Sequence, residues 1–97
     1  MDHADAASRA WDAHAEMYAE RFAPLTSFIA RSMFTMAAPQ LPEGARVLDV
    51  ACGSGALTLP ALERARAERE RGGPGGVVFA TDFSATMVEI TGRSAAA

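Results

Sequence analysis

Several residue types are scarce in this sequence, and each scarcity excludes a class of site. Cys52 is the one cysteine, so no disulfide can form within the chain, and a reducing cytoplasmic setting is the simpler expectation. The two histidines, His3 and His14, are too few and too far apart for the spacing of a metal site. We therefore expect neither a disulfide framework nor a metal centre.

Long apolar runs and an excess of positive charge are also missing. The most apolar stretch, "FIARSMFTMAAP", contains Arg31 and reaches Pro39, so it is too short to span a membrane. The N-terminus mixes acidic residues with alanine and lacks the apolar core of a secretory signal. The 9 basic residues stand against 12 acidic ones, which gives no reason to expect nucleic acid or anionic lipid as a partner. A soluble cytoplasmic protein is the expectation.

The chain does have hydrophobic content and helical periodicity. Its 97 residues, 49% of them hydrophobic, fit one small folded domain or part of a larger one. Two apolar stripes at helical spacing follow one another: Trp11, Ala15, Tyr18 and Phe22, then Leu25, Phe28, Ile29, Met33 and Met36. They predict a helix over residues 4–22 and a second one that Pro24 restarts and that ends before "PQLPEG". At this spacing we expect the aromatic and methionine side chains in the core.

The second half of the chain carries two strand patterns. "ARVLDVA" (residues 45–51) and "VVFATD" (residues 77–82) have the length and valine content of buried parallel strands. A helix period begins between them at Leu57, and the loop "GGPGG" separates that helix from the second strand. Ser84 is the expected N-cap of a last helix that reaches Ile90 and stops at Gly92.

The middle helix continues into the charged run "ERARAERER". Arg64 and Glu68 lie four residues apart, as do Arg66 and Glu70. Such alternating charge predicts a solvated helix face with weak ion pairs.

The order of elements predicts the fold class. Two helices are followed by strand, helix, strand and helix, and a strand–helix–strand run predicts a parallel βαβ unit with a right-handed crossover. We expect an α/β fold with an N-terminal helical cap over residues 1–42 and the βαβ unit over residues 43–97. Two parallel strands bury little surface, so this is expected to be an incomplete domain.

The turn "DVACGSG" after the predicted strand suits close approach of a ligand to the backbone, because Gly53 and Gly55 have no side chain. A dinucleotide needs a third glycine at the position of Thr58, and Asp49 would tend to repel a pyrophosphate. S-adenosylmethionine carries no phosphate and has a cationic sulfonium and ammonium, so a nearby carboxylate favours it. The turn alone is also compatible with a purely structural role.

"VLDVACGSG" resembles the first motif of class I S-adenosylmethionine-dependent methyltransferases. Asp49, Ala51, Gly53 and Gly55 fall on the four defined positions of that motif. The resemblance implies a Rossmann-like sheet and cofactor contacts from these four residues. It extends to "DFSATM", which is similar to a frequent D-x-S-x-x-M segment of the family.

Three further contacts follow from the same resemblance. Asp82, at the end of the second strand, would accept hydrogen bonds from both ribose hydroxyls, since a carboxylate offers two oxygens to a vicinal diol. Phe83 would cover one face of the adenine. "WDAHAEMYAERF" resembles the W-x-x-x-A-x-x-Y segment of small-molecule methyltransferases of the ubiquinone/menaquinone-biosynthesis type, which implies that Tyr18 lies near the cofactor. Asp82 alone is also compatible with simple capping of the last helix.

The resemblance implies methyl transfer to a small-molecule acceptor by an enzyme of which this chain is the N-terminal part. The family's sheet has seven strands and this sequence supplies two, so we expect the chain to be inactive alone and a second polypeptide to be a candidate for completing the sheet. No residue can be named as a catalytic base, and Cys52 has no base beside it in sequence. Two alternatives stay open: a non-catalytic interaction or regulatory module on the same scaffold, and a nicotinamide dinucleotide-binding protein.

Overall fold

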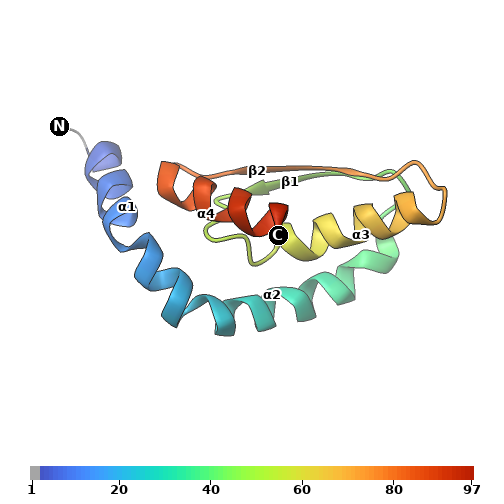
Figure 1. The fold of residues 1–97 in the computed structure, drawn as a ribbon, viewed down its shortest axis with the longest axis horizontal. Coiled ribbons are helices and arrows are strands. Elements are labelled where there is room, and N and C mark those ends of the chain that lie inside the picture. The colour runs from blue at the N-terminus through green and yellow to red at the C-terminus, as the bar shows by residue number, and fades with distance from the viewer. Residues whose placement is uncertain (1–2) are drawn as a thin grey trace.

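The computed structural model describes residues 3–97 as an α/β arrangement (Figure 1). Its elements are α1 (His3–Arg21), α2 (Ala23–Ala37), a short 3₁₀ helix η1 (Ala38–Gln40), β1 (Arg46–Val50), α3 (Thr58–Glu70), β2 (Val77–Thr81) and α4 (Ala85–Ala96). Two helices therefore precede a strand–helix–strand–helix run, as the sequence predicts.

The two strands form a parallel sheet connected by α3. Their register runs from Arg46 beside Val77 to Val50 beside Thr81. The amide of Cys52 donates to the carbonyl of Thr81 at 2.8 Å, which continues the pairing one step beyond β1. In Figure 1 the strands run side by side, and α3 and α4 lie between them and α2. The predicted parallel βαβ unit is confirmed.

The N-terminal helices form one curved arc along the molecule (Figure 1). The chain bends at Phe22, between the end of α1 and the start of α2. Pro24 lies in the first turn of α2, where its missing N–H costs no helical hydrogen bond. Pro24 therefore restarts the helix, as predicted.

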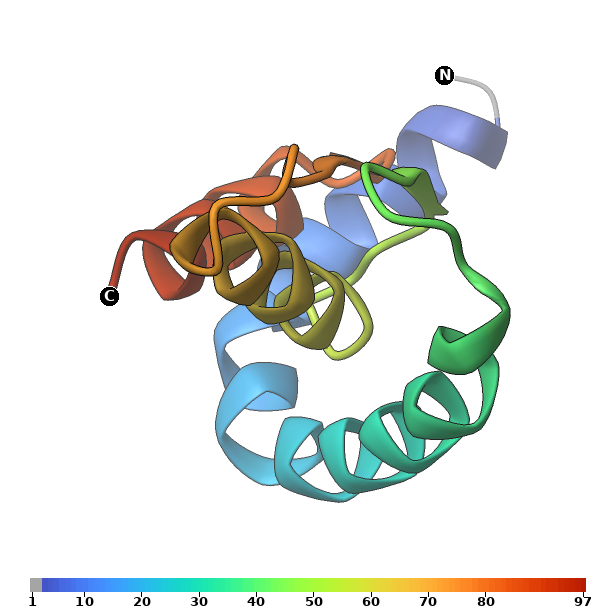
Figure 2. The ribbon, with the colours of Figure 1, turned by 90° about the vertical axis from the view of Figure 1, so that its right-hand side faces the viewer.

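A hydrophobic cluster of buried residues lies where α1 packs against α4. It consists of Ala15 from α1 with Met87 and Ile90 from α4, and Tyr18 and Ala19 pack against it. Figure 2 shows α4 lying against α1 and beside α3. This core fixes α1 to the βαβ unit and so positions α1 side chains beside the end of β2.

The prediction that the last helix ends at Gly92 is wrong, because α4 continues to Ala96. A helical glycine costs only about 1 kcal/mol relative to alanine, so tertiary contacts can outweigh it. Arg66 of α3 donates to the carbonyl of Ala95 at 2.6 Å, and Arg93 pairs with Glu16 of α1 at 2.8 Å. These partners lie on other elements, so the local pattern does not contain them.

The prediction of ion pairs along the α3 surface is also wrong. Arg64 donates instead to the carbonyl of Leu41 at 2.8 Å. Glu68 is only 3% exposed, and both of its carboxylate oxygens lie 3.0 Å from the amide of Gly44. The charged run of α3 therefore holds the loop that leads into β1, in place of forming pairs within the helix.

Many of the side chains expected in the core are exposed. The exposed set on the N-terminal helices comprises Trp11, Met17, Phe22, Leu25, Phe28, Ile29, Met33 and Met36. Phe28 is 71% exposed and Met36 79%. For the residues of α2 the core prediction fails because α2 meets α3 along little of its length. An exposed ion pair joins the two helices there, with Arg31 donating to Glu63 at 2.8 Å.

The sheet is covered by helices on one face only in the part of the chain that the structure describes. Leu48, Val50, Val77 and Phe79 on the other face are between 46% and 71% exposed. Over residues 3–97 no helix combines the length and hydrophobicity needed to cross a membrane. Within the same residues, no group of three or more His, Cys, Asp or Glu side chains is placed to hold a metal ion.

Candidate functional site

The turn after β1 is built from residues with left-handed backbone conformations. Ala51 has φ 58°, Gly53 has φ 57° and Gly55 has φ 100°. Three positive φ values within five residues turn the chain sharply from the end of β1 toward the start of α3. Glycine adopts these angles without steric cost, whereas alanine at position 51 does so with strain.

The two glycines of this turn serve different purposes. A Cβ at Gly53 would have no heavy atom within 4 Å, so the space beside this residue is open. A Cβ at Gly55 would lie 3.3 Å from the side chain of Thr91, and Gly55 itself is buried. Gly53 therefore leaves room for a ligand, while Gly55 allows the turn to pack against α4.

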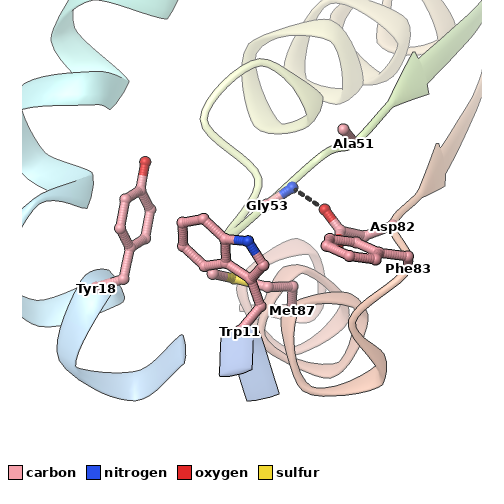
Figure 3. A pocket seen from close by; sticks show the side chains of 7 residues that line it. All are labelled: Trp11, Tyr18, Ala51, Gly53, Asp82, Phe83 and Met87. Atoms are coloured by element: carbon pink, nitrogen blue, oxygen red, sulfur yellow. Dashed lines mark hydrogen bonds between the residues drawn. The ribbon is translucent and has the colours of Figure 1, made fainter. Parts of the chain in front are cut away.

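A pocket of about 260 Å³ lies against the open side of the turn (Figure 3). It is lined by Trp11, Tyr18, Ala51, Gly53, Asp82, Phe83 and Met87. These residues come from α1, the glycine turn, the end of β2 and α4. Five residues of the predicted cofactor contacts thus share one pocket, although they span the chain from Tyr18 to Phe83.

Asp82 connects the end of β2 to the glycine turn. Its Oδ2 accepts a hydrogen bond from the amide of Gly53 at 2.9 Å (Figure 3). Its Oδ1 accepts another from the amide of Ser84 at 2.9 Å. These two bonds fix the plane of the carboxylate and leave one lone-pair direction on each oxygen for a further donor. Ser84 is the N-cap of α4, so Asp82 does not itself cap the helix; it holds the amide of Ser84 and lines the pocket.

Asp49 and Gly55 do not line this pocket. The Oδ2 of Asp49 accepts from the hydroxyl of Thr58 at 2.6 Å, which ties β1 to the first residue of α3. Asp49 is half-buried and lies in β1, two residues before Ala51, the first residue of the turn. The Asp49 carboxylate thus places negative charge near the turn and fixes the start of α3 against β1.

Trp11 was missing from the predicted site residues because its position in an apolar stripe predicts burial in the core. The structure places it on the pocket wall, 44% exposed and edge-on to Tyr18, with ring centroids 6.0 Å apart at 85°. Figure 3 shows the indole between Tyr18 and the Asp82–Phe83 pair. The signal that could have found it is its place at the start of the W-x-x-x-A-x-x-Y segment.

Met87 also lines the pocket and is 3% exposed. Phe83, by contrast, is 54% exposed. The pocket therefore combines one carboxylate with three aromatic rings and a thioether. Such walls suit a ligand that has a flat apolar part and a positive charge, because ring faces attract cations.

Cys52 lies inside the turn but behind the pocket. Its side chain is buried and its sulfur lies 3.7 Å from the hydroxyl of Thr91. Burial raises the pKa of the Cys52 thiol, and the negative charges of Asp82 and Asp49 raise it further. A raised pKa lowers the fraction of thiolate, which is the nucleophilic form, and this adds to the lack of a neighbouring base in the sequence.

The N-terminal turn of α4 is held by its own N-cap residue and by Asp12 of α1. Ser84 caps the helix, because its hydroxyl oxygen accepts from the amide of Met87 at 3.2 Å, as the sequence predicts. The same hydroxyl donates to the Oδ1 of Asp12 at 2.5 Å, and Thr86 donates its amide to that oxygen at 3.2 Å. The bonds from Ser84 and Thr86 lower the pKa of Asp12.

Comparison with known proteins links the chain to a methyltransferase. Over 68 residues, 70% of this chain, it is 38% identical to Nocamycin O-methyltransferase from Saccharothrix syringae. The matched part is 21% of that protein, so the chain spans about a fifth of its relative's length. No family model matches the chain. No solved structure matches it either.

Proposed function

We propose that this chain binds S-adenosylmethionine in the pocket beside the glycine turn and forms the cofactor-binding part of a class I methyltransferase acting on a small-molecule acceptor. The observation that carries the proposal is the hydrogen bond from Gly53 to Asp82. Gly53 and Asp82 belong to different motifs and lie 29 residues apart in the sequence. The bond brings the two motifs together beside one pocket. The similarity to an O-methyltransferase supports the same reaction class.

The pocket chemistry fits this cofactor better than a phosphate-bearing one. Asp82 lines the pocket, and each of its oxygens can accept one more hydrogen bond, which ribose hydroxyls would donate. Phe83 offers a ring for the adenine, and Trp11 with Tyr18 offers faces to a cationic group. When bound, S-adenosylmethionine supplies a methyl group attached to a positively charged sulfur. This chain's own residues would orient that donor, which is the proximity part of catalysis.

A nicotinamide dinucleotide fits the same site less well. The carboxylate of Asp82 lies at hydrogen-bond distance from the turn amide that a pyrophosphate would need. Negative charge at that point opposes a phosphate. The third glycine position is held by Thr58, whose hydroxyl is already bonded to Asp49.

A second candidate function is supported by the uncovered sheet face. A two-stranded sheet with Leu48, Val50 and Phe79 exposed is suited to being covered by another polypeptide, whether or not methyl transfer follows. In this alternative the chain is a non-catalytic module that keeps the turn and pocket as scaffold. The two candidates differ in one measurable property, which is binding of the cofactor.

Isothermal calorimetry of the 97-residue chain with S-adenosylmethionine tests the proposal. We expect binding by the parent chain and a loss of about tenfold or more in Asp82→Ala, because a charge-assisted contact is removed. Glu89→Ala is the matched control, since Glu89 is an exposed carboxylate on α4 that does not line the pocket. Absence of binding by the parent chain favours the non-catalytic module. Tighter binding of NADH than of S-adenosylmethionine contradicts the cofactor assignment.

A further inference from the structure

Three polar side chains on one face of α1 reach α4 and the segment that leads into it. Ser8, Asp12 and Glu16 are spaced four residues apart, so they share a face of the helix. Ser8 donates to the carbonyl of Phe83 at 2.8 Å, and Glu16 pairs with Arg93 at 2.8 Å. Asp12 lies between them, at the N-terminal turn of α4.

Asp12 makes the most enclosed of these contacts. Its Oδ1 accepts from the hydroxyl of Ser84, which is 0% exposed, and from the amide of Thr86. The positive N-terminal end of the α4 dipole also stabilises a carboxylate at this place. By contrast, the side chains of Glu16 and Arg93 are 64% and 66% exposed, and exposed pairs of this kind contribute little.

Hydrogen bonds connect Asp12 to the residues that line the pocket. Ser84, which donates its hydroxyl to Asp12, donates its amide to Asp82. Asp82 in turn accepts from Gly53 in the turn. A chain of hydrogen bonds thus runs from the glycine turn to α1, and it ends one residue from Trp11, which lines the pocket.

We propose that Asp12 is a positioning residue, which fastens α1 to the first turn of α4 and thereby holds Trp11 and Tyr18 against the cofactor pocket. The identity of the ligand rests on the proposed function, but the positioning of α1 does not. The apolar contact of Ala15 with Met87 and Ile90 holds α1 near α4. The contact of Asp12 sets which side of the helix faces the pocket.

Trp11 provides a direct readout, because it is the one tryptophan in the sequence. In Asp12→Ala we expect a red shift of its emission and a roughly twofold rise in quenching by acrylamide, because local opening exposes the indole. Asp12→Asn keeps an acceptor oxygen and loses the charge, so quenching should fall between Asp12→Ala and the parent chain. Glu16→Ala is the matched control on the same face, with quenching like that of the parent.

Calorimetry on the same variants connects α1 to the pocket. Asp12→Ala should bind S-adenosylmethionine roughly fivefold more weakly than the parent chain, because only the fraction with α1 in place binds fully. Glu16→Ala should bind like the parent. Far-UV circular dichroism should stay unchanged in all variants, which separates repositioning of α1 from unfolding.

Unchanged emission and quenching of Trp11 in Asp12→Ala would overturn the proposal. If Asp12→Ala does not fold, Asp12→Asn decides alone, with raised quenching in favour and parent-like quenching against. A parent chain that binds no S-adenosylmethionine contradicts the proposed function only, since the fluorescence comparison needs no ligand.

Discussion

At the scale of single residues, the two glycines in the turn after β1 have different roles. Gly53 leaves open space beside the turn, whereas Gly55 allows close packing against Thr91. Gly55→Ala adds a Cβ 3.3 Å from Thr91 at a φ of 100°, so both crowding and backbone strain oppose it. We expect a loss of about 1–3 kcal/mol in unfolding free energy. Urea denaturation measures it.

Gly53→Ala should behave differently. Its Cβ meets nothing within 4 Å, and Ala51 already adopts a similar φ of 58° in the same turn. We expect a smaller loss of stability, about 1 kcal/mol from the left-handed backbone, together with weaker binding of S-adenosylmethionine because the methyl group occupies the open side of the turn. Equal stability losses in the two variants, or unchanged binding in Gly53→Ala, would contradict the division of roles.

Cys52 gives a prediction about pH. Burial raises the pKa of its thiol in the folded chain, so folding favours the protonated form. The resulting stabilisation is complete below the pKa of the unfolded thiol and is lost as pH rises through the higher pKa of the folded one. We expect the rate of alkylation by iodoacetamide to rise at higher pH in the folded chain than in the chain unfolded in urea.

The unfolded chain serves as its own control in that experiment, because it contains the same single thiol. Cys52→Ser should show no labelling in either state. If labelling of the folded chain rises at the same pH as labelling of the unfolded chain, burial does not raise the pKa of the Cys52 thiol.

At the scale of elements, the sequence predicts those features that depend on neighbouring residues. Both strands, the proline that restarts α2 and the capping serine of α4 follow from local patterns, and the structure has them within one or two residues. These features need no knowledge of distant contacts. The hydrogen bond between Gly53 and Asp82 is not predicted, but it is compatible with the parallel sheet, because the ends of adjacent parallel strands meet at one edge.

The failed predictions depend on which partners from elsewhere in the chain are present or, for the exposed apolar side chains of α2, absent. α4 passes Gly92 because Arg66 of α3 donates to the carbonyl of Ala95 in its last turn. Glu68 is buried because it accepts from the amide of Gly44, 24 residues away. Trp11 lines a pocket because α4 lies beside α1, whereas a periodic aromatic alone predicts core. Apart from the W-x-x-x-A-x-x-Y segment that contains Trp11, the local sequence pattern carries none of this information.

At the scale of the whole molecule, the chain exposes more surface than a compact protein of its mass. Its accessible surface is 6389 Å², whereas about 5300 Å² is expected for a compact monomer of this size. The radius of gyration of 14.4 Å also exceeds the roughly 12.5 Å expected for a compact domain of this length. The excess reflects the arc of α1 and α2 and the uncovered face of the sheet.

That uncovered face leads to the last prediction. Leu48 and Phe79 are register partners on it and are 62% and 48% exposed, while Val47 and Val78 are partners on the covered face. Because an exposed apolar sheet with open edges associates with other chains, we expect sedimentation velocity to show concentration-dependent association of the parent chain. The double variant Leu48→Gln, Phe79→Thr should associate less with its unfolding free energy nearly unchanged.

The matched double variant on the covered face separates association from folding. Val47→Thr, Val78→Thr should lose stability, because it places hydroxyls against the layer formed by α3 and α4, and it should leave association in place. If the parent chain stays monomeric at every concentration, or if the two double variants lose association equally, the exposed face is not the surface that another polypeptide covers. The proposal that this sheet is completed by a further polypeptide would then lose its physical basis, while the pocket beside the glycine turn, which the exposed face does not line, would keep its own.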